Sequence, residues 1–357
     1  MSTNTHQPAG GAWLGFSLLT VFTWGVYGVF LATGQMAMAD PVHGLYKSFL
    51  FVGLAYFFVA VLAPLLLLLV RGANWNYPPD GMAWSLIAGI AGAIGAFGVL
   101  LAFAAHGQPS VVMAIVFAGA PIVNAFISLL QHPPVGGWGG IKPQFWAGIG
   151  VAALGGCLVT LFKPALHHPA GPAQVDHGTT WLVYSLLTVF AWGVYGVLLH
   201  TGQLKMRDPA NGRYKAFLFV GLAYLLVAVV VPFALLALMG ANLKYPLVGM
   251  SWSLVAGIFG AIGAFGVLLA FGARGIPSVV MAIVFAGAPV VNAIVSLLKR
   301  PPAEGWGSIN LLFWVGILLA ALGGCLVTLF KPMPAPAPQP ASAPLVPAPQ
   351  PAMEGAH

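Results

Sequence analysis

The chain alternates long apolar stretches with short polar segments from end to end. The apolar stretches of the first part are residues 13–33, 48–70, 83–105, 110–130 and 144–162. Each has about the 20 residues that an α-helix needs to cross some 30 Å of hydrocarbon. The pattern therefore predicts a series of membrane-spanning helices joined by short loops.

The same five stretches occur a second time, because residues 11–164 return at 179–332 with a constant offset of 168 and no gap. Trp24 thus corresponds to Trp192, and Cys157 to Cys325. We expect an all-α integral membrane protein of ten transmembrane helices in two five-helix repeats. Because five is odd, the second repeat should enter the bilayer in the opposite orientation, as in the inverted-topology repeats of secondary transporters.

The repeats define the domain organisation. A short segment, 1–12, precedes the first repeat at 13–164, and a polar linker at 165–178 leads to the second repeat at 179–332. Residues 333–357 are rich in Pro and Ala and almost free of charge, which favours a disordered tail. The first apolar stretch has full spanning length and no preceding Lys or Arg, so we expect it to remain as an anchor rather than a cleaved signal.

Composition supports a membrane protein, since 60% of the residues are hydrophobic and only 5% are charged, with a mean hydropathy of +0.94. A net charge of +7 does not indicate nucleic-acid binding, because the basic residues are scattered over many loops. We expect the lipid bilayer and a small-molecule substrate as partners; a homodimer is compatible with the sequence. We predict that Cys157 and Cys325 are small buried packing residues. We expect no metal site in the linker cluster of His167, His168, Asp176 and His177, and no cofactor.

Differences between the repeats indicate orientation, since basic residues are favoured on cytoplasmic loops. The second repeat has Lys205, Arg207 and Arg213 where the first has Ala37, Ala39 and Leu45. The pairs Asn76 and Lys244, Gln131 and Lys299, and His132 and Arg300 point the other way. On balance we predict an inner (cell) membrane protein with both termini in the cytoplasm.

Polar side chains at helical spacing indicate a cavity within the membrane, because each must find a partner or line water. In the first helix of each repeat the stripe is Ser17, Thr20, Trp24 and Tyr27, repeated as Ser185, Thr188, Trp192 and Tyr195. Trp and Tyr suit stacking against a sugar or another ring. The alternative is helix packing, with the hydroxyl groups bonded to backbone.

The fourth helix of each repeat carries a proline, Pro121 or Pro289, followed by Asn124 or Asn292. Proline leaves the carbonyls of Phe117 and Phe285 without their usual helical donor, so each Asn lies beside a free acceptor. We predict a hydrogen-bonding site for substrate here. An equally weighted interpretation has the asparagines bridge neighbouring helices.

The third helix of each repeat carries glycines at every third position, from Gly89 to Gly98 and from Gly257 to Gly266, for which close helix packing is the favoured interpretation. Lys47 and Lys215 open the second helix of each repeat, where lysine usually snorkels to the interface; turned inward, either would meet an anionic or hydroxylated substrate. Asp40 and Asp208 precede them, each followed by a proline, and suggest turns or caps. His200 replaces Ala32 and is more simply a hydrogen-bonded side chain than a functional one.

Missing motifs narrow the function. No carboxylate lies within the apolar stretches, whereas proton-driven exporters of organic cations normally need one. No phosphate-binding loop, dinucleotide fingerprint or catalytic motif occurs, so we do not expect an enzyme.

Two strings resemble a known family. Pro109-Ser-Val-Val-Met-Ala-Ile-Val-Phe-Ala-Gly-Ala-Pro121-Ile-Val-Asn124, with its copy at 277–292, is similar to the fourth helix of the EamA-type domains of the drug/metabolite transporter superfamily. Gly148-Ile-Gly-Val-Ala-Ala-Leu-Gly155-Gly156 is similar to the fifth. The sequence departs from that family in having Gln131-His132 and Lys299-Arg300 where Gly-Glu is common. The resemblance implies a ten-helix transporter, and the family's sugar and ureide carriers fit an aromatic, acid-poor cavity best.

We therefore expect a carrier of a small polar, largely uncharged metabolite such as a sugar or nucleoside-like ring, working alone or coupled to a proton or sodium ion. The expected substrate-binding residues fall into three kinds, aromatic, hydroxyl or amide, and cationic: Trp24, Tyr27, Trp192 and Tyr195; Thr20, Thr188, Asn124 and Asn292; Lys47 and Lys215. The alternatives are an exporter of amino acids or amphipathic drugs, and a passive pore or non-transporting scaffold.

Overall fold

The computed structural model describes residues 11–131, 138–165, 178–273, 275 and 277–331. Regular structure in these ranges is entirely helical. Ten helices within them are long and apolar enough to cross a membrane, from Ala12–Ala37 to Leu311–Leu329. The protein is thus a multi-pass, all-α membrane protein. The expected tail at 333–357 and the linker histidines lie outside the described residues.

All spans of the first repeat except the last run longer than the apolar stretches of the sequence. The helices of this repeat are α1 (Ala12–Ala37), α2 (Gly44–Tyr56), the π-helix η1 (Phe57–Leu62), α3 (Ala63–Val70), α4 (Pro79–Ala104), α5 (Pro109–Gln131), the 3₁₀ turn η2 (Trp138–Gly140) and α6 (Pro143–Leu161). In the same order, the second repeat consists of α7 (Thr180–Lys205), α8 (Gly212–Tyr224), the π-helix η3 (Leu225–Val230), α9 (Val231–Leu238), α10 (Leu247–Gly272), α11 (Pro277–Lys299), the 3₁₀ turn η4 (Trp306–Ser308) and α12 (Leu311–Leu329).

Proline and glycine set several helix limits. Pro79 and Pro143 occupy first helical positions, where a missing amide hydrogen costs nothing. Gly72 and Gly240 follow the ends of α3 and α9 with φ of 58° and 62°. That left-handed conformation favours glycine and terminates both helices at the same point of the repeat.

The second span of each repeat contains a π-helical segment that the sequence pattern did not indicate. η1 joins α2 to α3 and η3 joins α8 to α9 as one continuous span each. Pro64 and Pro232 lie near the start of the following α-helix. Because π-helical segments are rare and concentrate at functional sites, their presence at equivalent points makes both spans candidates for a functional role.

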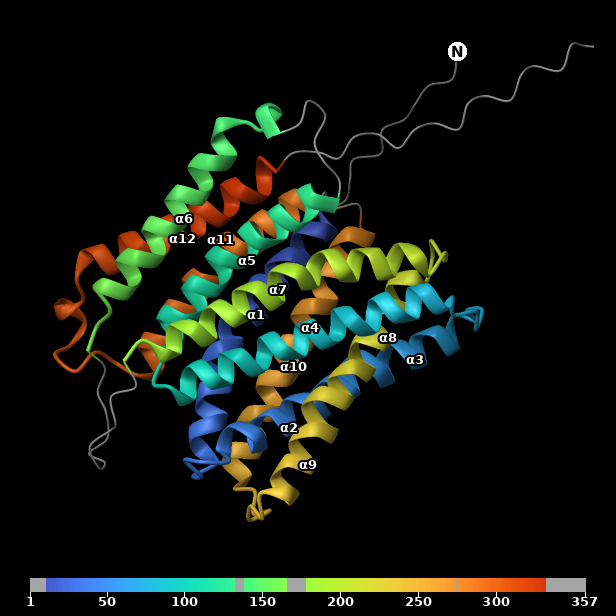
Figure 1. Ribbon diagram of the computed structural model, residues 1–357, viewed down its shortest axis with the longest axis horizontal. Helices are drawn as coiled ribbons and strands as arrows, with labels where there is room; N and C mark the ends of the chain where they lie inside the picture. The colour runs from blue at the N-terminus through green and yellow to red at the C-terminus, as the bar shows by residue number, and fades with distance from the viewer. Residues whose placement is uncertain (1–10, 132–137, 166–177, 274, 276, 332–357) are drawn as a thin grey trace, which may run out of the picture.

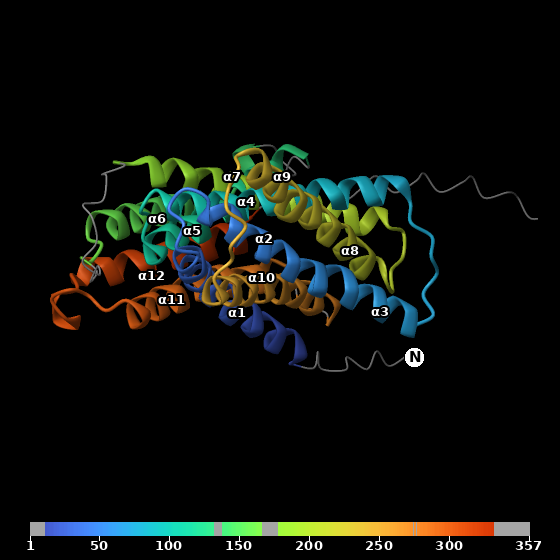
Figure 2. The same ribbon diagram turned by 90° about the horizontal axis from the view of Figure 1, so that it is seen from below.

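The largest helix contacts join one repeat to the other: α1 packs on α10, α4 on α7 and α6 on α12. Figure 1 shows α6 and α12 together at one edge, α2, α3, α8 and α9 at the opposite edge, and α1, α4, α7 and α10 between them. Figure 2, seen from below, again separates α6 and α12 from α3 and α8. The repeats interlock through their whole length rather than forming two separate bundles.

The equivalent helices α6 and α12 pack antiparallel. A side chain at Gly148 would meet Leu326 and Val327, and one at Gly316 would meet Leu158 and Val159. Rising numbers along α6 therefore face falling numbers along α12. Since 148 and 316 are equivalent positions, each contact has a counterpart with the roles of the repeats exchanged.

The glycines of α4 and α10 are used for close packing, as the favoured interpretation predicted. A Cβ at Gly89 would lie 2.8 Å from the backbone of Val220, and a Cβ at Gly257 would lie 2.8 Å from that of Val52. The bare helix surface lets the two repeats approach backbone to backbone.

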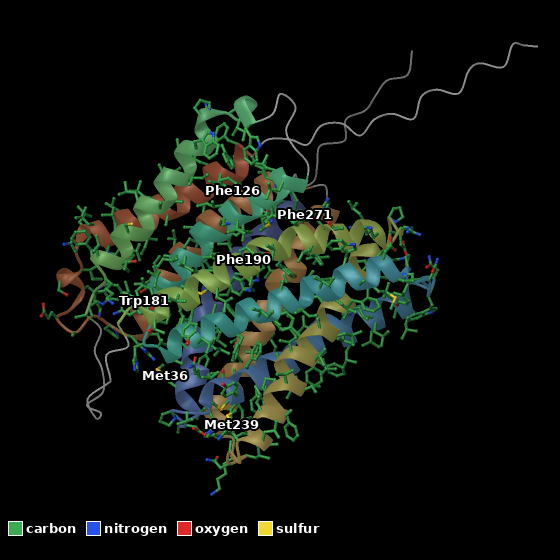
Figure 3. The ribbon with its side chains drawn as sticks, in the orientation of Figure 1. Met36, Phe126, Trp181, Phe190, Met239 and Phe271 are labelled. Atoms are coloured by element: carbon green, nitrogen blue, oxygen red, sulfur yellow. The ribbon has the colours of Figure 1, made fainter. Side chains whose placement is uncertain are left out.

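The outer surface is apolar, as lipid contact requires, and includes Phe22 and Phe190, which are 53% and 58% exposed. Figure 3 labels Phe190 on α7. Cys157 also lies on this surface, which corrects the expectation that both cysteines are buried; Cys325 is half-buried, and both are free thiols. The error arose because an apolar helix in a bilayer has no polar side to reveal its outward face.

Candidate functional site

The stripe on α1 faces α10 and is bonded to its backbone. The Thr20 hydroxyl donates to the carbonyl of Gly263 at 3.0 Å, and Trp24 Nε1 donates to the carbonyl of Gly260 at 3.1 Å. The stripe on α7 makes the same bonds to α4. Thr188 donates to Gly95 at 3.0 Å and Trp192 to Gly92 at 3.0 Å. Glycine carbonyls are open to side-chain donors because no Cβ covers them, so these four side chains bind the repeats together in this conformation.

Tyrosine and tryptophan side chains gather in the core where the repeats meet. Tyr56 and Tyr224 stack with ring centroids 3.7 Å apart and planes at 1°. Tyr27 is buried, and its ring lies 6.2 Å from that of Trp192. Tyr27, Tyr56 and Tyr224 belong to one buried core cluster, and Trp24, Trp192 and Tyr195 pack against it while partly buried; we call these six side chains the aromatic cluster.

Tyr56 and Tyr224 were missed by the sequence reasoning, although they occupy equivalent positions. Each is the last residue before a π-helix, η1 or η3. The available signal was the pair of equivalent prolines eight residues further along the chain, Pro64 and Pro232, which disturb the helix ladder in mid-span. The stack lies between the repeats, so any movement of one repeat against the other must shift it.

Asn124 and Asn292 bridge helices of different repeats, as the second interpretation predicted. Asn124 Nδ2 donates to the carbonyl of Gly193 at 3.1 Å, and Asn292 Nδ2 donates to that of Gly25 at 2.9 Å. The remaining amide oxygens differ. That of Asn124 accepts from Lys331 Nζ at 3.4 Å, whereas that of Asn292 is buried and has no hydrogen-bond partner among the described residues. A buried free acceptor is suited to a hydroxyl or amide donor of a solute.

Lys47 and Lys215 do not snorkel, since their side chains are 1% and 0% exposed. Lys47 Nζ lies 2.9 Å from Asp40 Oδ2 and donates to Asn242 Oδ1 at 2.9 Å and to the carbonyl of Lys244 at 3.2 Å. Asn242 and Lys244 belong to the loop between α9 and α10, in the other repeat. The expectation that Lys47 snorkels to the membrane interface is wrong, because the loop of the other repeat supplies hydrogen-bond acceptors for the buried ammonium group.

Lys215 makes the equivalent cluster at the start of α8. Its Nζ lies 2.9 Å from Asp208 Oδ2 and donates to Asn74 Oδ1 at 2.7 Å and to the carbonyl of Asn76 at 3.0 Å. We call these two groups the Lys47 clamp (Asp40, Lys47, Asn242 and Lys244) and the Lys215 clamp (Asp208, Lys215, Asn74 and Asn76). Each clamp fastens a helix start of one repeat to a loop of the other.

The clamps hold their aspartates charged. Burial by itself raises the pKa of Asp40. Hydrogen bonds from the Lys47 ammonium and the His43 backbone amide, together with the positive charges of the Lys47 and His43 side chains, outweigh burial and lower the pKa to about 2. The pKa of Asp208 is lowered by the same balance, with Lys215 and the amide of Asn211 outweighing burial. Asp40 and Asp208 also accept from amides of the turns that follow, His43 at 2.9 Å and Asn211 at 2.9 Å, as the turn interpretation predicted.

The expected site residues are thus grouped in two kinds of place. The aromatic, hydroxyl and amide side chains lie where α1, α5, α7 and α11 meet the other repeat, and the two lysines lie at helix starts. Of the described carboxylates, Asp40, Asp208 and Glu304 lie in connections and Asp80 in the first turn of α4. In the described part of the chain, no three His, Cys, Asp or Glu side chains are grouped to hold a metal ion.

Comparison with known proteins identifies a fold and no family. No family model and no curated protein matches the sequence. A solved structure described only as "Crystal structure of protein" is similar over 89% of this chain and 98% of its own, with a TM-score of 0.53 and 17% sequence identity. At that identity the likeness concerns the fold alone, which a solved structure therefore also adopts over nearly its whole length.

Proposed function

We propose that the chain is a secondary transporter in which two inverted repeats, each of the EamA type, move against each other by alternating access. The observation that carries the proposal is that contacts between the repeats occur in equivalent pairs, in which the two repeats exchange roles. Every bond from α1 to α10 has a counterpart from α7 to α4, and the equivalent helices α6 and α12 are antiparallel. Two structurally equivalent halves related in this way can exchange conformations, which opens the same site to either side in turn.

The substrate we propose is a small polar, largely uncharged metabolite such as a sugar or a nucleoside- or ureide-like ring. The aromatic cluster offers flat apolar faces, and the described spans carry no carboxylate beyond the first turn of α4 to balance an organic cation. Trp24, Tyr27, Trp192 and Tyr195 would stack on the ring, joined by Tyr56 and Tyr224. Asn124 and Asn292, with Thr20 and Thr188, would exchange their backbone partners for substrate hydroxyls.

The lysines act in this proposal through the clamps rather than by touching substrate. The Lys47 clamp and the Lys215 clamp lie at equivalent points of the two repeats, and therefore at opposite faces of the membrane if the repeats are inverted. Opening one while the other stays closed would expose the aromatic cluster to one side only. Movement could be driven by the substrate gradient alone or by a proton or sodium ion.

Counterflow in liposomes tests the proposal. Purified protein is reconstituted, vesicles are loaded with unlabelled solute, and uptake of radiolabelled sugars, nucleosides and amino acids is followed. A carrier accelerates labelled uptake when unlabelled solute is inside, a passive pore does not, and a scaffold gives no flux above empty vesicles. Preference for an amino acid or amphipathic drug would favour the exporter alternative.

The matched variants separate stacking from packing at the tryptophans. Replacing Trp24 and Trp192 by Phe removes the hydrogen bonds to Gly260 and Gly92 but keeps an aromatic ring at each position. Replacing the two tryptophans by Ala removes the hydrogen bonds and the rings. We expect the Phe pair to transport with altered KM and the Ala pair to lose counterflow while still inserting in the membrane. Unchanged transport by the Ala pair would remove the stacking role.

Inner-membrane location with both termini in the cytoplasm is part of the same proposal. It places Lys205, Arg207 and Arg213 on the cytoplasmic side, where basic residues are favoured. A reporter fused after His357 should stay inaccessible to reagents outside intact cells.

A further inference from the structure

Two arginines from different repeats lie against one tyrosine ring, Tyr214. The guanidinium carbon of Arg71 lies 5.0 Å from the ring centroid of Tyr214, and that of Arg213 lies 5.1 Å from the same centroid. Tyr214 is buried, together with Leu68 and Ala73, where the end of α3, the start of α8 and the end of α10 meet. The two guanidinium carbons therefore lie no more than about 10 Å apart, the sum of their distances to the shared ring centre.

Neither guanidinium is paired with a carboxylate of the described residues. Among the residues that the structure describes, neither Arg71 nor Arg213 takes part in an ion pair, whereas Lys205, Arg207 and Lys215 nearby each contact an aspartate. Arg213 Nε is buried and finds no hydrogen-bond partner in the part of the chain that the structure describes. A buried guanidinium donor normally binds an acceptor, and planar donors of this kind suit phosphate oxygens.

The two repeats differ here in a correlated way. The first repeat has Leu45 where the second has Arg213, and Ala104 where the second has Gly272. A Cβ at Gly272 would collide with the Nη1 atom of Arg213. The space for this guanidinium is thus made by a glycine that only the second repeat has. At the position equivalent to Arg71 the chain has Met239, so the corresponding place at the other end is apolar; Figure 3 shows Met239 far from Phe271, the neighbour of Gly272.

We propose that Arg71 and Arg213 form a binding site for a phosphate-bearing anion, and that the headgroup of an anionic membrane lipid occupies it. Arg71 directly follows the span Gly44–Val70, Arg213 is the second residue of the span Gly212–Leu238, and Gly272 is the last residue of the span Leu247–Gly272. The site therefore lies at the ends of spanning helices, at the depth of lipid headgroups. Basic side chains between helix ends at the cytoplasmic face are the usual receptors for such lipids.

The site joins the repeats, because Arg71 belongs to the first and Arg213 to the second. A bound headgroup would hold the end of α3 to the start of α8, next to the Lys215 clamp. The binding itself does not depend on transport, so it can be measured whether or not the chain moves a solute.

The test uses the purified full chain in a neutral detergent and measures its thermal unfolding with three probes. These are dioctanoyl phosphatidylglycerol, dioctanoyl phosphatidylcholine and inorganic phosphate. We expect phosphatidylglycerol to raise the melting temperature of the wild type and phosphatidylcholine, whose phosphate is neutralised by choline, to leave it unchanged. A shift with inorganic phosphate alone of the same size would support the anion site and overturn its assignment to a lipid.

Replacing each arginine by the residue at the equivalent position of the other repeat tests the location of the site. Arg71→Met with Arg213→Leu should weaken apparent phosphatidylglycerol binding by about ten-fold or more, as expected for loss of charge-assisted bonds. Gly272→Ala keeps both charges but displaces the Arg213 side chain, so it should also weaken binding. The control is Lys205→Ala with Arg207→Ala, which removes two charges from neighbouring positions and leaves Tyr214 and its arginines in place.

The outcomes distinguish a specific binding site from general attraction of the lipid to surface charge. If the control loses as much affinity as the arginine pair, attraction is diffuse and the site is refuted. If the arginine pair binds phosphatidylglycerol as the wild type does, the assignment is equally wrong. Should the arginine pair not purify, Arg71→Met alone is sufficient, because Arg71 is exposed at a helix end and its loss should still reduce the shift.

Discussion

At the scale of single residues, the buried lysines show how the repeats are fastened. An ammonium inside a protein needs a counter-charge and several acceptors, and Lys47 has an aspartate of its own repeat with an amide oxygen and a carbonyl of the other. Lys215 repeats the arrangement with Asp208, Asn74 and Asn76. Equivalent lysines in the same short sequence motif thus connect the repeats at both places.

Lys47→Met should destabilise the folded protein by about 3 kcal/mol, because it leaves the carboxylate of Asp40 enclosed without its partner. Unfolding in detergent, followed by intrinsic tryptophan fluorescence against denaturant, measures the change. Adding Asp40→Asn should restore part of the loss. Lys205→Ala is the control, since its pair with Asp80 is exposed, and it should change stability by less than about 1 kcal/mol.

The Asp40 carboxylate also predicts an acid limit of stability. Its pKa is about 2 in the folded protein against an ordinary 3.8, so the folded state favours the charged form. The contribution is fully present above about pH 4 and is lost as the pH falls through about 2. Asp40→Asn should flatten the fall in melting temperature over that window. A fall as steep in the variant as in the wild type would show that other carboxylates govern it.

The sequence pattern singled out several side chains that connect the repeats, but it did not predict which groups they contact. Trp24, Thr20 and Asn124 were singled out by helical spacing, but their partners are glycine carbonyls far away in the chain, which no local pattern encodes. Tyr56 and Tyr224 were missed because an aromatic residue in an apolar run is not distinctive. Burial of Lys47 depends on a loop about 195 residues further along the chain, which a one-dimensional pattern cannot place.

At the scale of elements, small residues decide where equivalent helices meet. The α6–α12 contact is formed across Gly155, whose added Cβ would collide with the backbone of Ala320, and Gly323, which faces Ala152 in the same way. Helix count, approximate limits and glycine packing were all predictable from the apolar periodicity and residue size. The π-helices η1 and η3 were not, because one extra residue per turn changes the hydrogen bonding without changing composition.

Gly155→Ala should weaken the α6–α12 contact by about 1–3 kcal/mol, because backbone cannot move aside as a flexible side chain can. Gly150→Ala in the same helix is the control. Nothing lies within 4 Å of a Cβ at Gly150, so alanine there should be neutral or slightly stabilising. Thermal unfolding of both variants in one detergent makes the comparison. Equal melting temperatures would mean that the two helices can separate without cost to the fold.

At the scale of the whole molecule, the two clamps should act in opposite senses. If the repeats are inverted as proposed and both termini are cytoplasmic, the Lys47 clamp lies at the outer face and the Lys215 clamp at the inner face. Asn242→Ala removes an acceptor from the first and Asn74→Ala one from the second. Each variant should therefore loosen one face while the other stays fastened, and shift the population toward the conformation open on the loosened side.

Site-specific labelling distinguishes the two directions. In a chain with Cys157→Ala and Cys325→Ala, a single Tyr56→Cys reports access to the position of Tyr56 at the junction of the repeats. A membrane-impermeant maleimide added outside intact cells should label it faster with Asn242→Ala and slower with Asn74→Ala, and inverted vesicles should reverse that order. The same direction of change with both substitutions would place the clamps on one face, and neither inverted repeats nor alternating access could then be maintained.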